Sequence, residues 1–488
     1  MKLLFEHRTD FPKLVWLAEC SDKTGEVTVY HGRNVETGTD FCVAGVWDGN
    51  FSDGGFDQSD IVAGTGVRMR NNRVVFVTPA NTLDRISFVK TDNGYTISNA
   101  LSALFAREKL EPVRGHDYQK DFETVIRGIR LYNKTIPTTS REVSLVYFNN
   151  LAYDGKTLAE IEKPDCVPHF STFAEYNDFL FSTAEKLDAN ARAFQRKFPI
   201  QIVSTCSSGY DSSLATVIAK HMGSSKVLSI ANAQSGFNRP DSGEKVAQAL
   251  GLPCEVRSSI QKNYKNEEAI WASMGEALDL HFTVFDYPQP VSLLLTAFHG
   301  DMMWERTPFD LTEFLHRHDP SGASFSEWGL VEGVIHMSIG FWAIRRGKEI
   351  QALSLLEEMK PWTLFNNYDR PIPRRIIETA GVRRGDFAKV KRVAAIASDW
   401  LPNPWPYSEN LKKEFKQFAQ DNNIPIPHSF TIALWRLYNR FHWHVFRRIG
   451  LLFGKEDLLK ISWAPFKTRW VFWYWAILKL KRNYSFPQ

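Results

Sequence analysis

The sequence of 488 residues contains little cysteine and no long uninterrupted apolar run. Its five cysteines are scattered without CxxC spacing, which argues against a disulfide scaffold or a cysteine zinc site and favours a reducing compartment. No run reaches the roughly 18 apolar residues of a membrane-spanning helix. The first residues are too poor in apolar side chains for a signal peptide. We therefore expect a cytoplasmic protein.

The net charge of +4 is modest, but the basic residues are unevenly distributed. Residues 434–488 hold eleven Lys or Arg against two acidic residues, together with six of the fifteen tryptophans. Interleaved aromatic and basic residues are typical of a helix at an anionic membrane surface and of a nucleic-acid stacking groove. They also fit a helix packed on its own protein. We expect peripheral contact with the inner membrane surface or internal packing, and consider nucleic acid the weaker alternative.

One stretch, residues 202–213, has the pattern of an anion-binding site. An apolar segment leads into a turn of small residues, and the turn leads into a helix. Backbone N–H groups in such a turn and at the helix start point at a phosphate, and small side chains let the backbone come close. Asp211 fits this setting as a ligand of a magnesium ion that bridges phosphates. The candidate binding residues are Ser204, Ser207, Ser208, Gly209, Tyr210, Asp211 and Ser212.

The turn resembles the pyrophosphate-binding loop of the ATP pyrophosphatase (PP-loop) superfamily, whose pattern is Ser-Gly-Gly-x-Asp-Ser. The matching residues are Ser207-Ser208-Gly209-Tyr210-Asp211-Ser212. Ser208 replaces the first glycine, and a serine there is strained if the position requires a positive φ angle. The alternative interpretation is a polar strand-to-helix turn that binds nothing.

The segments around this turn alternate between strand and helix patterns. Strands are expected at 198–202, 226–231 and 254–256, with a helix at 242–250, which predicts a parallel sheet whose ligands bind at the carboxyl ends of the strands. A further strand-like run at 293–298 leads into Gly300 and Asp301. That turn partly resembles the Ser-Gly-Asp/Glu turn of asparagine synthetases, so Asp301 is the expected partner of Asp211 on magnesium.

The N-terminal third reads as short strands separated by turns, followed by a helix at 101–107. This layout resembles asparagine synthetase and β-lactam synthetase, in which an amidohydrolase-like sandwich precedes the PP-loop domain. The glutaminase version of that sandwich uses a cysteine directly after the initiator methionine. Lys2 stands there in this chain, so we expect an inert, structural domain. Cys42 is interpreted as a buried strand cysteine rather than as a displaced nucleophile.

The same resemblance implies further site residues. The end of the second strand, at Ala231 and 232–235, lies against adenine and ribose in the family. A basic segment at 368–392 supplies a lysine that neutralises the leaving pyrophosphate. Lys391 is the first candidate and Lys389 the second, with Arg374 and Arg375 as alternatives.

Together these observations predict an α/β protein of three parts. Residues 1–165 form an α+β amidohydrolase-like sandwich, residues 170–400 a parallel-sheet PP-loop domain that binds ATP and Mg²⁺, and residues 401–488 a basic, aromatic helical tail. The expected function is adenylation of a small-molecule or peptide carboxylate, followed by transfer to an amine or ammonia. The alternatives are a PP-loop amidotransferase or thiolation enzyme acting on a sugar or nucleic-acid base, and a non-catalytic protein with a degenerate ATP site.

Overall fold

The computed structural model describes residues 1–231, 240–258, 263–307, 311, 314–366, 368–387, 408–425, 428–441, 445, 449 and 470–486. Its centre is a five-stranded sheet in the order β16-β15-β14-β17-β18. All four neighbouring pairs are parallel, as the alternation of strand and helix patterns predicts. The strands are β14 (Gln201–Thr205), β15 (Lys226–Ile230), β16 (Cys254–Arg257), β17 (Ser292–Thr296) and β18 (Val334–Ser338). The first of them begins at Gln201, later than the expected 198–202.

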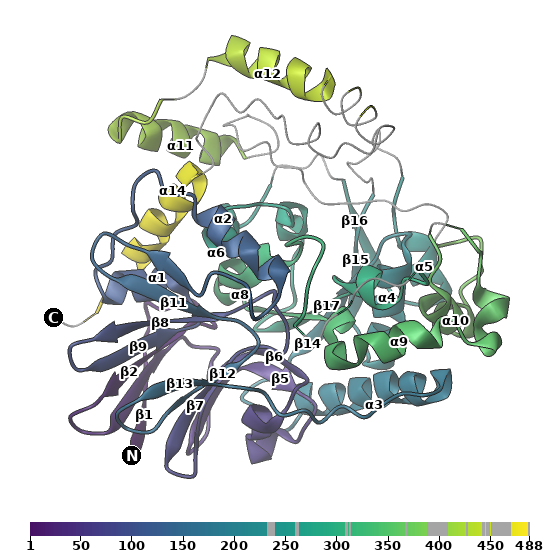
Figure 1. Ribbon diagram of the computed structural model, residues 1–488, viewed down its shortest axis with the longest axis horizontal. Coiled ribbons are helices and arrows are strands. Elements are labelled where there is room, and N and C mark those ends of the chain that lie inside the picture. Colours follow the sequence, from purple (N-terminus) through teal and green to yellow (C-terminus); the bar gives the residue numbers. More distant parts are fainter. Residues whose placement is uncertain are drawn as a thin grey trace.

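Helices cover both faces of this sheet, because its central strands are apolar on both sides (Figure 1). On one face α4 (Tyr210–His221) packs on β14 and β17, and α3 (Phe173–Ala191) and α10 (Pro371–Thr379) pack on α4. On the other face α8 (Ser326–Glu332) packs on β18, α6 (Glu267–Met274) packs on α8, and α14 (Trp470–Leu480) packs on α6. Shorter helices are α5 (Glu244–Ala249), α7 (Gly300–Met303) and α9 (Gly347–Leu353). The helix α3 begins with a capping box, in which the side chains of Thr172 and Glu175 are bonded to each other's backbone.

Two further sheets are built from residues 2–161. The seven-stranded sheet has the order β1-β3-β2-β9-β8-β11-β10, and the six-stranded sheet has the order β13-β12-β7-β6-β5-β4. The strands are β1 (Lys2–His7), β2 (Trp16–Ser21), β3 (Glu26–His31), β4 (Glu36–Thr37), β5 (Phe41–Trp47), β6 (Val62–Arg70), β7 (Arg73–Val77), β8 (Ile86–Thr91), β9 (Gly94–Ser98), β10 (Thr135–Pro137), β11 (Glu142–Val146), β12 (Asn150–Tyr153) and β13 (Leu158–Ile161). The helices α1 (Leu101–Arg107) and α2 (Tyr118–Glu123) follow β9 in sequence. The protein is therefore a mixed α/β structure with several sheets.

The two N-terminal sheets share a core. The ring of Trp16 in β2 stacks on Phe76 in β7 at 6.2 Å between centroids, and its indole Nε1 donates to Thr65 Oγ1 of β6 at 2.8 Å. Cys42 is fully buried in β5, where burial raises the pKa of its thiol to about 12. That environment keeps the thiol protonated, as expected for a structural strand cysteine.

The C-terminal helix α14 belongs to the folded body rather than to a separate tail. The ring of Trp473 stacks on Tyr118 of α2 at 4.1 Å between centroids, and Phe472 stacks on Trp271 of α6 at 4.4 Å. α11 (Glu409–Asp421) and α12 (Ser429–Phe441) lie farther out (Figure 1). Within the described residues, no helix combines the length and apolarity needed to cross a membrane.

Candidate functional site

The order of the parallel sheet places its switch point between β14 and β17, since the chain builds outward from β14 on one side and from β17 on the other. Crevices at the carboxyl ends of strands at such a point are the usual ligand sites of open α/β sheets. A cavity of about 220 Å³ lies there. Its lining includes residues from the two segments at the ends of these strands, 205–212 and 296–301, and residues from 279–282, 319–321 and 368–370.

The predicted phosphate loop forms one wall of this cavity, and hydrogen bonds within the protein hold it. The Ser207 N–H donates to Ser212 Oγ at 3.0 Å, and the Gly209 N–H donates to Ser207 Oγ at 3.1 Å. The Tyr210 N–H faces the Tyr368 hydroxyl at 3.4 Å. A phosphate bound to this loop would therefore displace the serine and tyrosine hydroxyl groups that the backbone N–H groups now face.

Ser208, the departure from the glycine pattern, is not strained. Its φ angle is not positive, and Gly209 also has an extended conformation with φ −80°. Ser208 Oγ donates to Asp241 Oδ1 at 2.6 Å, and its N–H donates to the Asp241 carbonyl at 3.1 Å. Ser208 points away from the main cavity and instead lines a separate one with residues 385–387. A serine is therefore compatible with the backbone of this loop.

The two carboxylates predicted to hold magnesium line the same cavity. Asp211 lies in the first turn of α4 and Asp301 in the first turn of α7. A Cβ atom on Gly300 would lie 3.2 Å from Asp211 Cγ and only 2.3 Å from the Trp304 ring, so this position accepts only glycine. The described residues contain no cluster of three or more His, Cys, Asp or Glu able to hold a metal alone. Two carboxylates that leave the remaining positions to phosphate and water fit magnesium.

Arg370 is the cation that the structure brings to Asp211, and the sequence analysis did not single it out. Its Nη1 donates to Asp211 Oδ2, and its Nε donates to Glu305 Oε2 at 3.2 Å. Burial alone would lower the pKa of Arg370, but the adjacent Asp211 carboxylate outweighs it and raises this pKa. Glu305 also accepts the Asp369 N–H at 3.3 Å. Because Glu305 does not line the cavity, its role is to orient Arg370. The only signal in the sequence was the position of Arg370 directly before the helix-starting Pro371.

Three ionisable side chains of the cavity wall are buried in their uncharged forms. Burial lowers the pKa of His281 and of His299 to about 3, so both rings are neutral at physiological pH. Burial raises the pKa of the Cys206 thiol to about 12, which rules it out as a nucleophile near neutrality. His299 has a φ angle of 71°, which is rare for a residue with a side chain and lets the chain turn from β17 into α7.

Asp279 is buried in the same wall and holds a fixed position. Its Oδ2 accepts the Gly322 N–H at 2.9 Å and the Ser324 hydroxyl at 2.6 Å. Burial raises the pKa of Asp279 to about 6 despite these two hydrogen bonds. No motif pointed to this residue, because it is one isolated acid in an apolar stretch.

Three other residues predicted for the site, Ser204, Ala231 and Arg374, do not line the cavity. Ser204 is fully buried within β14 and does not line the cavity. Ala231 uses both backbone groups internally, since its N–H donates to the Arg257 carbonyl and its carbonyl accepts the Asp241 N–H, each at 2.9 Å. Arg374 is buried and donates to the Tyr210 hydroxyl.

The remaining basic candidates of the 368–392 segment are Arg375, Lys389 and Lys391. Arg375 lies outside the cavity and pairs with Glu358 at 2.7 Å. Lys389 and Lys391 lie outside the described residues, as does 232–235.

The described residues enclose only part of the volume that an ATP molecule needs. Ligand pockets usually measure about 300–1,000 Å³, whereas this cavity measures about 220 Å³. Comparison of the chain with protein-family models and with curated proteins finds no match.

Proposed function

We propose that the protein is an asparagine-synthetase-like ligase that joins a carboxylate to a nitrogen nucleophile and converts ATP to AMP and pyrophosphate. The observation that carries this proposal is that the phosphate loop and the Asp301 turn, far apart in sequence, line one cavity at the switch point of the parallel sheet. In this proposal the parallel sheet is a PP-loop domain. The two N-terminal sheets are the glutaminase-like sandwich.

In the first step a carboxylate oxygen of the substrate attacks the α-phosphorus of ATP. A new oxygen–phosphorus bond forms, the bond to the bridging oxygen breaks, and pyrophosphate leaves. The 207–212 loop and the start of α4 bind the departing phosphates. Asp211 and Asp301 would hold Mg²⁺, which supplies positive charge against the phosphates. Lys391 or Lys389 is proposed to neutralise the leaving group.

In the second step the nitrogen attacks the carbonyl carbon of the acyl-adenylate. The bond from this carbon to the AMP oxygen breaks, AMP leaves, and the nitrogen loses a proton to solvent. The nitrogen is proposed to come from ammonia or an amine rather than from glutamine hydrolysed by this chain, since Cys42 is buried as a protonated thiol.

Titration with MgATP tests the first requirement of the proposal, which is that the protein binds MgATP. Wild type should bind MgATP, and Asp211→Asn should weaken that binding by about ten-fold or more, because it removes one magnesium ligand. Asp286→Asn is the matched control, since this carboxylate is exposed and lies outside the cavity. Absence of MgATP binding by the wild type would overturn the proposal. With a substrate in hand, formation of AMP rather than ADP and identification of an amide would separate it from other PP-loop chemistry.

A second candidate is a binding protein whose nucleotide site does not turn over. One observation favours it: the N–H groups of Ser207, Ser208 and Gly209 already donate to acceptors of the protein. Such a protein would bind MgATP without exchanging labelled pyrophosphate into ATP in the presence of any carboxylate.

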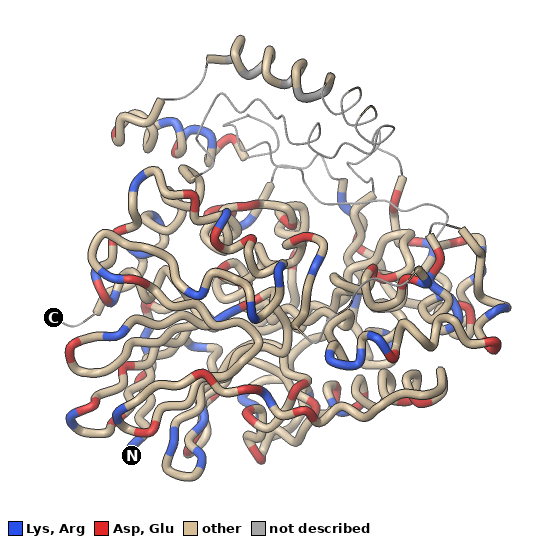
Figure 2. Tube along the Cα trace, in the orientation of Figure 1, with Lys and Arg blue, Asp and Glu red and all other residues tan. Residues whose placement is uncertain are grey.

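We also propose that α12 contacts an anionic membrane surface. Phe430, Leu434 and Leu437 are 78%, 47% and 68% exposed, and their spacing places them on one face of the helix. The surrounding sequence is strongly basic, which suits anionic lipid. Over the described body, by contrast, acidic and basic residues are intermingled (Figure 2). Three aromatic residues of α14, Phe472, Trp473 and Trp475, are buried in the protein and are not part of this surface.

A further inference from the structure

The wall of the cavity formed by residues 279–282 and 319–321 has no role in the phosphate chemistry described above. We propose that this wall, here called the amine subsite, binds the nitrogen substrate as a cationic amine that carries no carboxylate group. Its residues are Asp279, His281 and Asp319. The assignment of this amine as the nucleophile rests on the proposed ligase function: the bound ammonium group first loses a proton to solvent, and the neutral amine then attacks. The preference for a cation rests on the subsite alone.

The charge of the cavity lining supports a cation. Four carboxylates line it, those of Asp211, Asp279, Asp301 and Asp319, whereas the described lining contains one permanent cation, Arg370. That arginine is already engaged with Asp211 and Glu305. The nearby Arg317 does not line the cavity and donates to the carbonyls of Thr82 and Ser321. If the substrate were an amino acid, its α-carboxylate would therefore find no unengaged cation among the described residues that line the cavity.

His281 supplies the second, independent observation. The residue is 3% exposed and lines the cavity, and neither ring nitrogen has a hydrogen-bond partner of good geometry among the described residues. The Leu278 carbonyl lies close enough to favour a proton on the ring nitrogen that faces it. The other nitrogen of the neutral ring then presents a lone pair. A buried polar group without a partner costs about 1–3 kcal/mol, which a ligand N–H would recover.

The subsite is held in place before any ligand arrives, which reduces the entropic cost of binding. Asp279 is fixed by Gly322 and Ser324, as described above, and Asp319 Oδ1 accepts the Ser321 N–H at 2.9 Å. The helical turn η4 (Leu280–Val284) carries His281. The Tyr287 hydroxyl donates to the Phe282 carbonyl of this turn at 3.1 Å.

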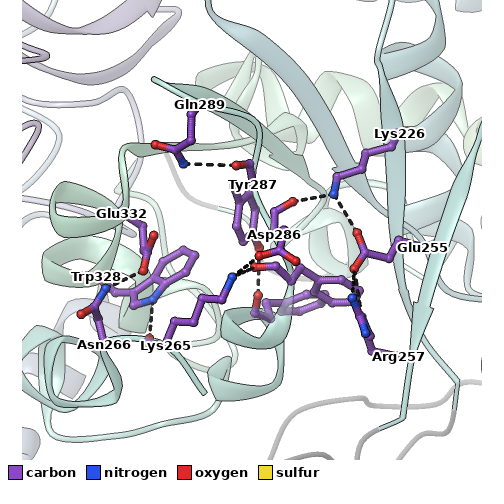
Figure 3. Close-up of polar contacts among 12 residues, drawn as sticks. Lys226, Glu255, Arg257, Lys265, Asn266, Asp286, Tyr287, Gln289, Trp328 and Glu332 are labelled. Atoms are coloured by element: carbon purple, nitrogen blue, oxygen red, sulfur yellow. Dashed lines mark hydrogen bonds and ion pairs between the residues drawn. The ribbon is translucent and has the colours of Figure 1, made fainter. Parts of the chain in front are cut away.

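A polar network continues from η4 to the sheet (Figure 3). Lys226 of β15 bridges Glu255 of β16, at 2.7 Å, and the Asp286 carbonyl. Lys265 pairs with the Asp286 carboxylate, and the Trp328 indole donates to the Lys265 carbonyl at 3.0 Å. These contacts tie the segment after η4 to two strands and to α8, so the orientation of the subsite is set by the sheet.

A three-way comparison of small probes tests the proposal on the full chain. Ethylammonium is the cation, ethanol is the neutral isostere, and glycine carries the additional carboxylate. Saturation-transfer NMR measures binding of each, with affinities in the millimolar range being the most that such small ligands allow. We expect ethylammonium to bind at least about ten-fold more tightly than ethanol or glycine. Equal binding of the three probes, or no binding of ethylammonium, would overturn the proposal.

Variants locate the binding. Asp279→Asn should weaken ethylammonium binding by about ten-fold, because it removes a buried charge at the subsite. Glu267→Gln is the matched control, since Glu267 is also a buried acid but does not line the cavity. Should Asp279→Asn fail to fold, Asp319→Asn serves in its place, because Asp319 is exposed. Unchanged binding in the folded variant would contradict the assignment.

MgATP binding, measured on the same samples, separates the two proposals. Ethylammonium binding without MgATP binding would retain the cation subsite and remove the ligase function. MgATP binding without a preference for ethylammonium would remove only the amine subsite.

Discussion

The guanidinium of Arg370 donates to Asp211 through Nη1 and to Glu305 through Nε, so a single buried cation holds carboxylates from two separate segments. Its side chain is 1% exposed, whereas that of Asp211 is 23% exposed and faces the cavity. The arginine therefore fixes the carboxylate proposed to bind magnesium.

Replacing Arg370 should destabilise the protein. The substitution Arg370→Met keeps most of the side-chain volume but leaves Glu305 buried without its cation, and we expect the free energy of unfolding to fall by about 3 kcal/mol. Urea denaturation at neutral pH measures this change. Arg383→Met is the control, because Arg383 is 85% exposed and its ion pair with Asp386 contributes less than about 1 kcal/mol. Equal effects of the two substitutions would contradict a structural role for Arg370.

Introducing the glycine of the PP-loop pattern at position 208 should not improve the site. Ser208 has an ordinary backbone conformation and donates a hydrogen bond to Asp241, so Ser208→Gly loses that bond and gains freedom in the unfolded chain. We expect a loss of about 1–2 kcal/mol in stability and no gain in MgATP affinity. Ser208→Ala isolates the contribution of the hydroxyl. A glycine variant that binds MgATP more tightly would show that the serine does limit the loop.

Binding of ethylammonium should depend on pH through Asp279, whose pKa burial raises to about 6. Only the ionised carboxylate attracts the cation, so affinity should be constant at higher pH and fall by about ten-fold on going from pH 7 to pH 5. The charged groups facing Asp279 are Asp319 and Arg317, and the neutral His281 lies beside it in the wall. NMR titration measures the profile, and Asp279→Asn should flatten it. A midpoint unchanged in this variant would assign the titration to another group.

Trp473 should contribute strongly to stability, although it lies close to the end of the sequence. Its side chain is fully buried, stacks on Tyr118, and donates to the Ala272 carbonyl at 2.9 Å. We expect Trp473→Ala to cost about 3–5 kcal/mol in the free energy of unfolding. Phe430→Ala is the aromatic control, because this side chain is 78% exposed and should change stability by less than about 0.5 kcal/mol.

Membrane contact through α12 can be tested by co-sedimentation with vesicles. Wild type should bind vesicles rich in phosphatidylserine, and the double variant Phe430→Glu with Leu437→Glu should lose most of that binding, because it places charge on the apolar face. Leu131→Glu is the control, since Leu131 is 63% exposed but lies in the N-terminal part. Retained binding by the double variant would place the contact elsewhere, and binding to RNA in preference to vesicles would favour a nucleic-acid surface.

Several elements followed from local sequence alone. The helix α1 has the expected bounds, 101–107. The short strands expected in the N-terminal third are also present, because apolar and β-branched residues bounded by turn residues favour strands. The capping box of α3 is equally local, since its hydrogen bonds join residues only three apart. The position of the phosphate loop at the end of β14 was equally local.

The rest of the site was decided by tertiary structure. Arg370 donates a hydrogen bond to Asp211, and the absence of a side chain at Gly300 leaves room beside the Asp211 carboxylate. Asp279 and His281 line the same cavity because separate segments pack around one edge of the sheet. Such contacts join residues far apart in sequence, and their geometry depends on how the sheet and helices pack.

The C-terminal aromatic residues show the same division between sequence and structure. Their composition alone fitted a membrane surface, a nucleic-acid groove or a core. The packing of α14 on α2 and α6 buried Phe472, Trp473 and Trp475, while α12 kept an apolar face exposed. Composition determines that such residues must be shielded from water, but only the available partner surfaces decide what shields them.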